Sequence, residues 1–176
     1  VRFVATSASR DVSNRAEFVD GIVARLGIEP DIISGDEEAA LSFLGATADL
    51  LNFESAPTAP YLVIDIGGGS TEFVLGTTKP KAAISTNVGC VRMTERHLVS
   101  DPATPEQIAA ATADIDAAID QAYLAVPIAE AKSLIGLAGS VTTVAALALG
   151  LSEYDSEAIH GNHISASEVH RVTQEL

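Results

Sequence analysis

The segment from Tyr61 to Leu75 constrains the fold of this chain more than any other. Residues 61–66 form an apolar run broken only by Asp65, and three consecutive glycines follow it at once. Such a run is typical of a buried strand, and the glycines predict a tight turn. Because residues 71–75 again favour a strand, the segment predicts a hairpin and not the strand–loop–helix of a P-loop.

The rest of the chain alternates between strand-like and helix-like segments. Apolar or β-prone runs predict further strands, and apolar residues at helical spacing predict helices between them. Together they predict an α/β fold. The further strands are expected at 1–6, 31–33, 82–88 and 133–137, the helices at 15–26, 35–48, 91–98, 105–122, 138–149 and 166–176, a polar turn at 7–11 and a loop at 151–164.

Helix ends carry recognisable signals. Ser, Thr or Asn followed three residues later by Glu or Gln predicts a capping box, and glycine after a helix predicts its end. The helix at 105–122 also shows an apolar stripe that we expect to be buried. The capping pairs are Asn14–Glu17, Ser34–Glu37, Thr104–Gln107 and Ser165–Glu168, the stops are Gly27 and Gly150, and the stripe is Ile108, Ala111, Ile115, Ala118, Ile119 and Ala122.

A connector at residues 52–60 contains two prolines and is the best candidate for a boundary between lobes. It predicts a first part at 1–58 and a second part at 59–176. The chain starts with a strand-like run and without Met, and it stops within a predicted helix. We therefore expect it to be a fragment of a larger protein.

Charge and composition exclude several classes of protein. The 176 residues carry 24 acidic and 10 basic side chains, a formal charge of −14, which argues against a nucleic-acid or anionic membrane partner. The 47% apolar fraction supports a folded core. No uninterrupted apolar stretch is long enough for a membrane span. A single cysteine, Cys90, excludes an intramolecular disulfide and fits the reducing cytoplasm; we expect it to be a buried small apolar residue.

The glycine turn and its neighbours are the strongest candidate site. Successive backbone N–H groups of Gly67, Gly68 and Gly69 suit a phosphate oxygen, and Ser70 and Thr71 add hydroxyl groups. The carboxylates of Asp65 and Glu72 on either side would repel a phosphate unless a divalent cation lay between them. The alternative is a glycine-rich hairpin with incidental acids, which the full combination makes the weaker interpretation.

A second candidate is the acidic segment Gly35-Asp36-Glu37-Glu38-Ala39. Acids at a helix N-terminus are favoured by the helix dipole alone, which is a sufficient structural explanation. A catalytic interpretation needs one of them to take a proton from water, and Glu38 is the best placed because Glu37 is occupied if it closes a capping box.

Two other segments offer weaker support. Gly139 and Ser140 follow a strand and open a helix, which suits an anion or a nucleotide but also close helix–strand packing. Arg10 follows the first strand, and its guanidinium is suited to bind a phosphate through two N–H groups. The alternative is that Arg10 pairs with Asp11 or Glu17 on the surface. His160 and His163 have a spacing that metals use, but no third ligand lies near them in sequence, so we expect them to be solvated.

The order of these motifs resembles the exopolyphosphatase / guanosine pentaphosphate phosphatase (Ppx/GppA) family, over nearly the whole chain. The resemblance implies the actin-like, ribonuclease H-like fold of the sugar kinase–Hsp70–actin superfamily, with the second lobe largely complete and the first partial. It also implies roles for the candidate residues: Glu38 as the general base, Asp65 and Glu72 as handlers of metal and water, Gly67–Thr71 as the second phosphate loop, Arg10 as a residue near the substrate, and Gly139-Ser140 as a loop that approaches a nucleotide.

The family's first phosphate loop, Asp-x-Gly-Thr-Asn-Ser, is missing from this chain. The leading hypothesis is a Mg²⁺-assisted hydrolase that releases terminal phosphate from inorganic polyphosphate, from pppGpp or from both. The alternative is a module that binds polyphosphate or an alarmone without chemistry; an ATP-dependent kinase is a third and weaker hypothesis. The sequence does not choose between the two substrates, and a homodimer stays open beside a monomer.

Overall fold

Two β-sheets and eight α-helices organise the part of the chain that the computed structural model describes, residues 2–53 and 55–176. One sheet has two strands and the other has four. Val1, at the start of the first expected strand, lies outside the described residues, as does Glu54 within the connector.

The N-terminal segment contains the two-stranded sheet. Strand β1 (Val4–Ala5) pairs in parallel with β2 (Asp31–Ile32), and helices α1 (Ser7–Asp11) and α2 (Arg15–Leu26) connect them. Residues 7–11, expected to be a turn, are therefore helical. The prediction of a capping box at Asn14 is also wrong. The Asn14 backbone carbonyl, and not its side chain, accepts the hydrogen bond from the Glu17 backbone N–H. Gly27 ends α2 in the left-handed region, as expected.

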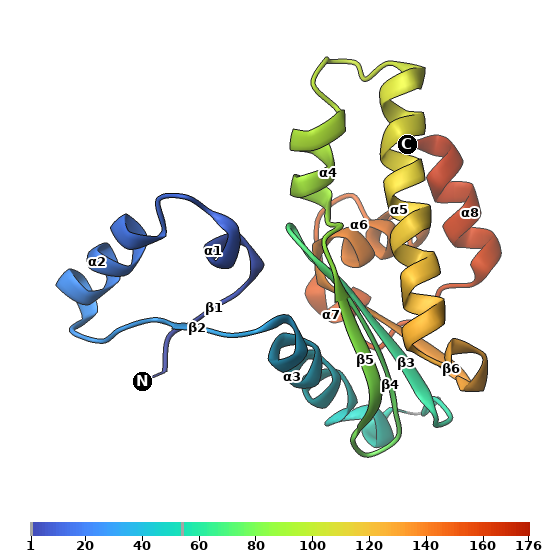
Figure 1. Cartoon of the computed structure of the whole chain (residues 1–176). Coiled ribbons are helices and arrows are strands. Elements are labelled where there is room, and N and C mark those ends of the chain that lie inside the picture. The colour runs from blue at the N-terminus through green and yellow to red at the C-terminus, as the bar shows by residue number, and fades with distance from the viewer. Residues whose placement is uncertain (1, 54) are drawn as a thin grey trace.

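The four-stranded sheet has the order β5-β4-β3-β6 (Figure 1). Strands β3 (Tyr61–Ile66), β4 (Thr71–Gly76) and β5 (Pro80–Thr86) form an antiparallel meander, and β6 (Ser133–Leu137) joins β3 in parallel. The predicted hairpin at residues 61–75 is confirmed, with Asp65 directly opposite Glu72. Because β3 and β6 run the same way, the turn after β3 and the residues after β6 lie at one edge of the sheet.

Each face of this sheet is covered by helices. Helix α3 (Gly35–Thr47) packs on one face through Phe43, and its core cluster includes Val63 and Val74. Helix α5 (Pro105–Ala125) covers the other face, where Ala122 packs with Leu62 and Leu75. Successive residues of β3 thus point to opposite cores, which explains its uninterrupted apolar sequence.

The remaining elements surround this layer. They are α4 (Cys90–His97), α6 (Ala138–Ala148), α7 (Ser156–Ile159), α8 (Ala166–Glu175) and the short 3₁₀ turns η1 (Leu50–Asn52) and η2 (Ile128–Glu130). Helix α4 runs beside α5, and α8 packs against α6 (Figure 1). Complete capping boxes at Thr104 and Ser165 are confirmed. Ser34 accepts from the Glu37 backbone N–H, but Glu37 itself contacts Arg2, so this box is only half formed.

Three expectations about burial and loops are corrected. The alanines of the α5 stripe are buried, whereas Ile108, Ile115 and Ile119 are exposed. Cys90 is exposed, because it lies in the first turn of α4 at the surface. The expected loop at 151–164 contains the short helix α7, whose first N–H groups are capped by Asp155.

Helix α3 lies before the predicted boundary at residues 58/59 but packs on the sheet that follows it. The division into 1–58 and 59–176 stays a prediction. In residues 2–53 and 55–176, no helix combines the length and the apolar character that a membrane crossing requires.

Candidate active site

Polar side chains form a row across three strands at one end of the four-stranded sheet. Asp65 of β3 pairs in register with Glu72 of β4, which in turn pairs with Ser85 of β5. Residues that are opposite each other point to the same face, and here that face is the one covered by α3. The row therefore lies beside the first turns of α3, where the acidic segment begins.

Glu72 is the most buried of these acids, with only 1% of its surface exposed. The Ser85 hydroxyl donates to Glu72 Oε1 over 2.7 Å. Burial raises the pKa of the Glu72 carboxyl above its ordinary value; the hydroxyls of Ser85 and Ser70 oppose this shift, and the nearby charges of Glu38 and Asp65 add to it. The site thus concentrates negative charge where it is poorly solvated.

The other two acids are each held by a neighbour. Ser42, two turns along α3, donates to Asp65 Oδ2 over 2.6 Å. Arg10 Nη1 lies 3.0 Å from Glu38 Oε2 and donates to the Ile33 carbonyl over 2.8 Å. Glu38 and Arg10 are both largely buried by their surroundings. Arg10 therefore takes neither of its two expected surface partners and instead fixes Glu38.

The glycine turn is bounded by contacts with α4. Within the turn, the Gly67 N–H donates to the Ser70 carbonyl over 3.0 Å. From α4, the Cys90 N–H donates to the Gly67 carbonyl and the Arg92 N–H to the Gly68 carbonyl, over 3.1 and 2.9 Å. The close approach depends on Gly89, where a Cβ atom would lie 2.6 Å from the Gly68 carbonyl oxygen.

The hydroxyl residues after the glycines have different roles. Ser70 is 2% exposed, and its hydroxyl opposes the rise in the pKa of the Glu72 carboxyl. Thr71 donates its hydroxyl proton to the Val88 carbonyl over 2.8 Å. The expected hydroxyl donor at Thr71 is therefore committed to the chain itself, because its buried side chain joins β4 to the segment that leads into α4.

Gly139 and Ser140 lie at the start of α6, at the same sheet edge as the glycine turn. A Cβ atom at Gly139 would meet nothing within 4 Å, so close packing does not explain this glycine. Close packing does apply at Gly136, where a Cβ atom would lie 2.6 Å from a methyl carbon of Val141.

The sequence model that describes the Ppx/GppA phosphatase family matches residues 1–176, the whole chain. The chain belongs to the Ppx/GppA phosphatase family. Exopolyphosphatase 2 of Mycobacterium tuberculosis is 42% identical over all of this chain and 56% of its own length. A guanosine-5'-triphosphate,3'-diphosphate pyrophosphatase of Pseudoalteromonas atlantica is 40% identical over 67% of this chain and 22% of its own length.

Solved structures agree in fold. A crystal structure described as an exopolyphosphatase-like protein superposes on 99% of this chain, and 56% of its own, with a TM-score of 0.93 and 49% identity. The Ppx/GppA family member of Aquifex aeolicus covers 99% of this chain and 54% of its own, with a TM-score of 0.76 and 28% identity. The expected α/β, actin-like fold is confirmed, and the chain spans about half the length of these relatives.

The carboxylates beside the glycine turn of this family member suit Mg²⁺ better than a metal that is held by three or more protein side chains. Within the described ranges, no three His, Cys, Asp or Glu side chains form a ready-made metal cluster, and His160 and His163 are exposed. Mg²⁺ is commonly held by one or two carboxylates together with substrate phosphates and water. Asp65 and Glu72, adjacent across the β3–β4 pair, offer such a set.

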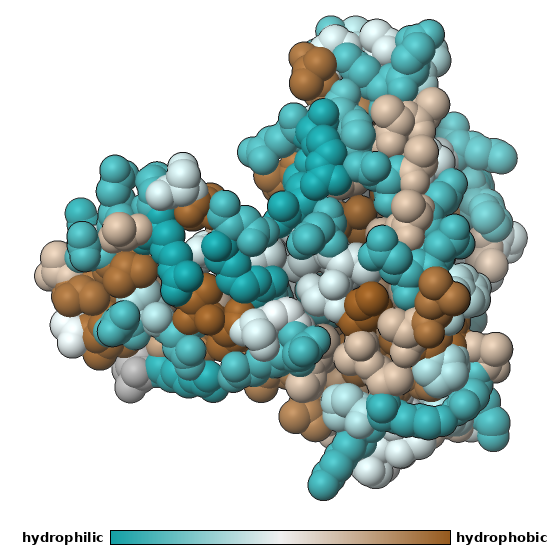
Figure 2. All heavy atoms as spheres, in the orientation of Figure 1, coloured by the Kyte–Doolittle hydropathy of each residue, from teal (hydrophilic) through white to brown (hydrophobic). Residues whose placement is uncertain are grey.

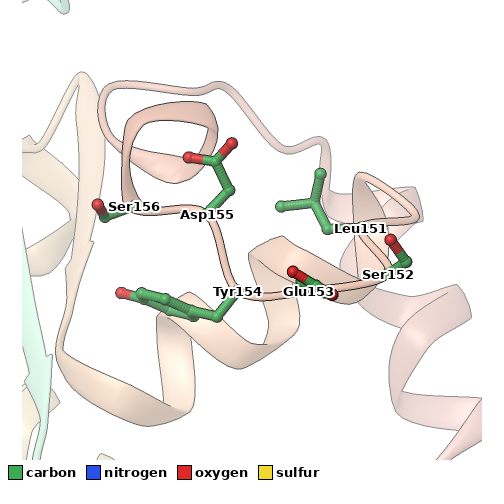
Figure 3. A pocket seen from close by; sticks show the side chains of 6 residues that line it. All are labelled: Leu151, Ser152, Glu153, Tyr154, Asp155 and Ser156. Carbon is green, nitrogen blue, oxygen red and sulfur yellow. The ribbon is translucent and has the colours of Figure 1, made fainter.

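Two surface hollows are alternative sites in this Ppx/GppA chain. A hollow of about 390 Å³ is lined by residues 151–156 (Figure 3), but its Asp155 carboxylate caps α7 and no cationic side chain lines it. A second, of about 290 Å³, lies between the end of β5 and helices α4 and α5. Figure 2 shows a further indentation, mostly hydrophilic, between the N-terminal segment and the α4–α5 side of the molecule. We favour the carboxylate row because, unlike these hollows, it joins acids to a glycine turn.

Sequence reasoning missed three residues of this site: Ser42, Ser85 and Arg92. Ser42 and Ser85 orient Asp65 and Glu72. Arg92 Nε donates to the Gly69 carbonyl over 2.6 Å, and its Nη2 forms an ion pair with Asp11. An alternation signal was available only for Ser85, since it lies on the predicted strand opposite Glu72; nothing local marks the other two.

Proposed function

We propose that the protein of which this chain is part hydrolyses a terminal phosphoanhydride bond. The observation that carries the proposal is the pairing of Asp65 with Glu72 across β3 and β4 beside the glycine turn. Ser85, which donates to Glu72, lies against Gly35 in the first turn of α3, the turn that carries Glu38. Phosphoryl transfer needs positioning and neutralisation of charge more than covalent chemistry. Backbone donors next to an acidic site would position the phosphoryl group. A cation bound by the acids would neutralise its charge.

Glu38 is the proposed general base. It would accept a proton from water as the water attacks the terminal phosphorus in line with the leaving oxygen. Arg10 supports this role, because its guanidinium is itself anchored to the Ile33 carbonyl and holds one oxygen of Glu38. The second oxygen of the same carboxylate is then the one aimed at water.

Asp65 and Glu72 are the residues that would hold Mg²⁺. When bound, the cation supplies charge neutralisation for the phosphoryl oxygens. The buried Glu72 fits this role, since a nearby cation would offset the cost of keeping its carboxylate ionised. Ser42 and Ser85 would keep both carboxylates in one orientation.

The glycine turn, Gly67 to Ser70, is the proposed phosphate cradle. Backbone N–H groups bind an anion without bringing a bulky side chain near it. Gly139 and Ser140 lie at the same sheet edge, and we assign them to the nucleotide end of a substrate that has one. Arg10 would contact phosphate only if it released Glu38.

The proposed substrates are inorganic polyphosphate and guanosine pentaphosphate, because relatives that are 40–42% identical to this chain carry exopolyphosphatase and guanosine-5'-triphosphate,3'-diphosphate pyrophosphatase names. A cytoplasmic site of action fits the single cysteine. The second candidate is a module that binds polyphosphate or an alarmone without chemistry, since Arg10 already holds one oxygen of Glu38.

Phosphate release from polyphosphate and from pppGpp, with Mg²⁺ and with EDTA, tests the proposal. The measurement should compare this chain with the protein carrying its natural flanking sequence. Mg²⁺-dependent release from either substrate supports a hydrolase. Tight polyphosphate binding without release, in the longer protein, would replace it with the binding module.

A further inference from the structure

Three successive carbonyl groups of the glycine turn are engaged by α4. The Gly67 carbonyl accepts from the Cys90 N–H, the Gly68 carbonyl from the Arg92 N–H, and the Gly69 carbonyl from Arg92 Nε. The first two are backbone contacts that any residue except proline could make. The third depends on one side chain, that of Arg92.

These contacts determine where the N–H groups of the turn point. In a planar trans peptide the carbonyl and the following N–H point in opposite directions. Because the three carbonyls face α4, the N–H groups of Gly68, Gly69 and Ser70 face away from it. Successive N–H groups that point to one side form an anion-binding nest.

Arg92 also reaches the N-terminal segment. Its Nη2 forms an ion pair with Asp11 at the end of α1, while Nε holds Gly69. A Cβ atom at Gly69 would lie 2.7 Å from Ser7 Oγ and 3.6 Å from Arg92 Nη2. The turn is therefore enclosed between α1 and α4, and Arg92 joins the two.

We propose that Arg92 is a positioning residue for phosphate binding: it fixes the Gly69–Ser70 peptide so that the Ser70 N–H faces the phosphate, and it ties that peptide to α1 through Asp11. This inference rests on the proposed function, because it assumes that the turn is the phosphate cradle. Arg92 itself does not touch the substrate in this scheme.

The geometry requires arginine and not only a positive charge. The planar guanidinium offers donors in different directions, so one side chain serves a carbonyl and a carboxylate together. A lysine ammonium would keep the charge but lose the fixed fork. Arg92→Lys is therefore expected to behave more like Arg92→Met than like the wild type.

Kinetics with the naturally flanked protein and inorganic tripolyphosphate form the first arm of the test. Arg92→Met and Arg92→Lys should lower kcat/KM by about 10-fold to 100-fold, as removing the hydrogen-bond partner of a metal ligand does. Asp11→Asn, which keeps the Gly69 contact, should lower it less. Arg96→Met is the matched control, because Arg96 lies one turn further along α4 and pairs with Asp114.

Amide hydrogen exchange of the free protein is the second arm and does not depend on activity. The Gly67 and Cys90 amides, which donate to the carbonyls of Ser70 and Gly67, should exchange faster in Arg92→Met than in Arg96→Met, while the amides of β3 are unchanged. If Arg92→Met fails to fold, Arg92→Lys carries both measurements.

The two arms separate the possible failures. An active wild type with equal activity and equal exchange in the Arg92 and Arg96 variants would overturn the role of Arg92 and leave the proposed function intact. An inactive wild type whose Arg92 variants still loosen the turn would overturn the proposed function and retain Arg92 as the residue that shapes it.

Discussion

Two turns of small residues lie at one edge of the four-stranded sheet and differ in almost every other respect. The turn after β3 holds Gly67–Ser70, and the start of α6 after β6 holds Gly139 and Ser140. The first is held by α4, through backbone N–H groups and the Arg92 side chain. The second is open, with nothing within 4 Å of a Cβ atom at Gly139.

The difference teaches that small residues alone do not set the geometry of a turn. Both turns are built from small residues, but only the first has its carbonyl groups held by a neighbouring helix and carboxylates beside it. A site needs its backbone donors to be oriented before the ligand arrives, since ordering them at binding would cost affinity. The predictions below test this contrast, starting with the largest effect.

The largest expected effect is on catalysis at Glu38. Glu38→Gln should lower kcat for phosphate release at least about 100-fold, because a general base contributes roughly 10²- to 10⁴-fold. Glu37→Gln is the matched control: it is the preceding residue of α3, and its carboxylate pairs with Arg2 at the surface. Equal rates of phosphate release for both variants would contradict the role of Glu38 as the general base beside the turn after β3.

The next effect is on stability and separates the two turns directly. Gly69→Ala should lower the free energy of unfolding by about 1–3 kcal/mol, because the new methyl group would overlap Ser7 Oγ. Gly139→Ala meets open space in the first turn of α6 and should raise it by about 0.4–1 kcal/mol. Urea unfolding of both variants checks this, and equal destabilisation would contradict the contrast.

A smaller effect concerns the pH dependence of stability at Glu72. Its pKa is raised by burial in the folded state, so its stabilising contribution is complete below the ordinary glutamate pKa and is lost as the pH rises through the raised value. In EDTA, Glu72→Gln should therefore gain stability relative to the wild type as the pH rises through that window.

Added Mg²⁺ should reverse the comparison at the upper end of the pH range, since only the wild type offers the cation its second carboxylate. Thermal unfolding at several pH values, with and without Mg²⁺, measures both effects. A difference between the two proteins that is constant with pH would contradict the burial of an ionisable group there.

The sequence predicted correctly those features that depend on interactions between residues close together in the chain. Strand β3 follows from an apolar run bounded by glycine, and the capping boxes at Thr104 and Ser165 follow from hydrogen bonds within one turn. The same reasoning failed at Asn14, where the backbone carbonyl of the capping residue satisfies the helix start instead.

Tertiary contacts explain what the sequence could not predict. Ser42 meets Asp65 across 23 positions, and Arg92 meets Asp11 across 81. No periodicity relates such pairs. The same holds for Ile115 and Ile119 of α5. The sequence shows an apolar stripe on this helix but not which side of the stripe packs on the sheet, and the structure places the alanines there.

The central claim is that the turn after β3 binds the terminal phosphate. Backbone amide shifts in the NMR spectrum of Glu38→Gln, titrated with tripolyphosphate and Mg²⁺, test it most directly, since this variant should bind without turnover. The account predicts shifts at Gly68, Gly69 and Ser70, with residues 138–140 responding only to a nucleotide such as pppGpp. Shifts confined to residues 138–140 or 151–156 would contradict it.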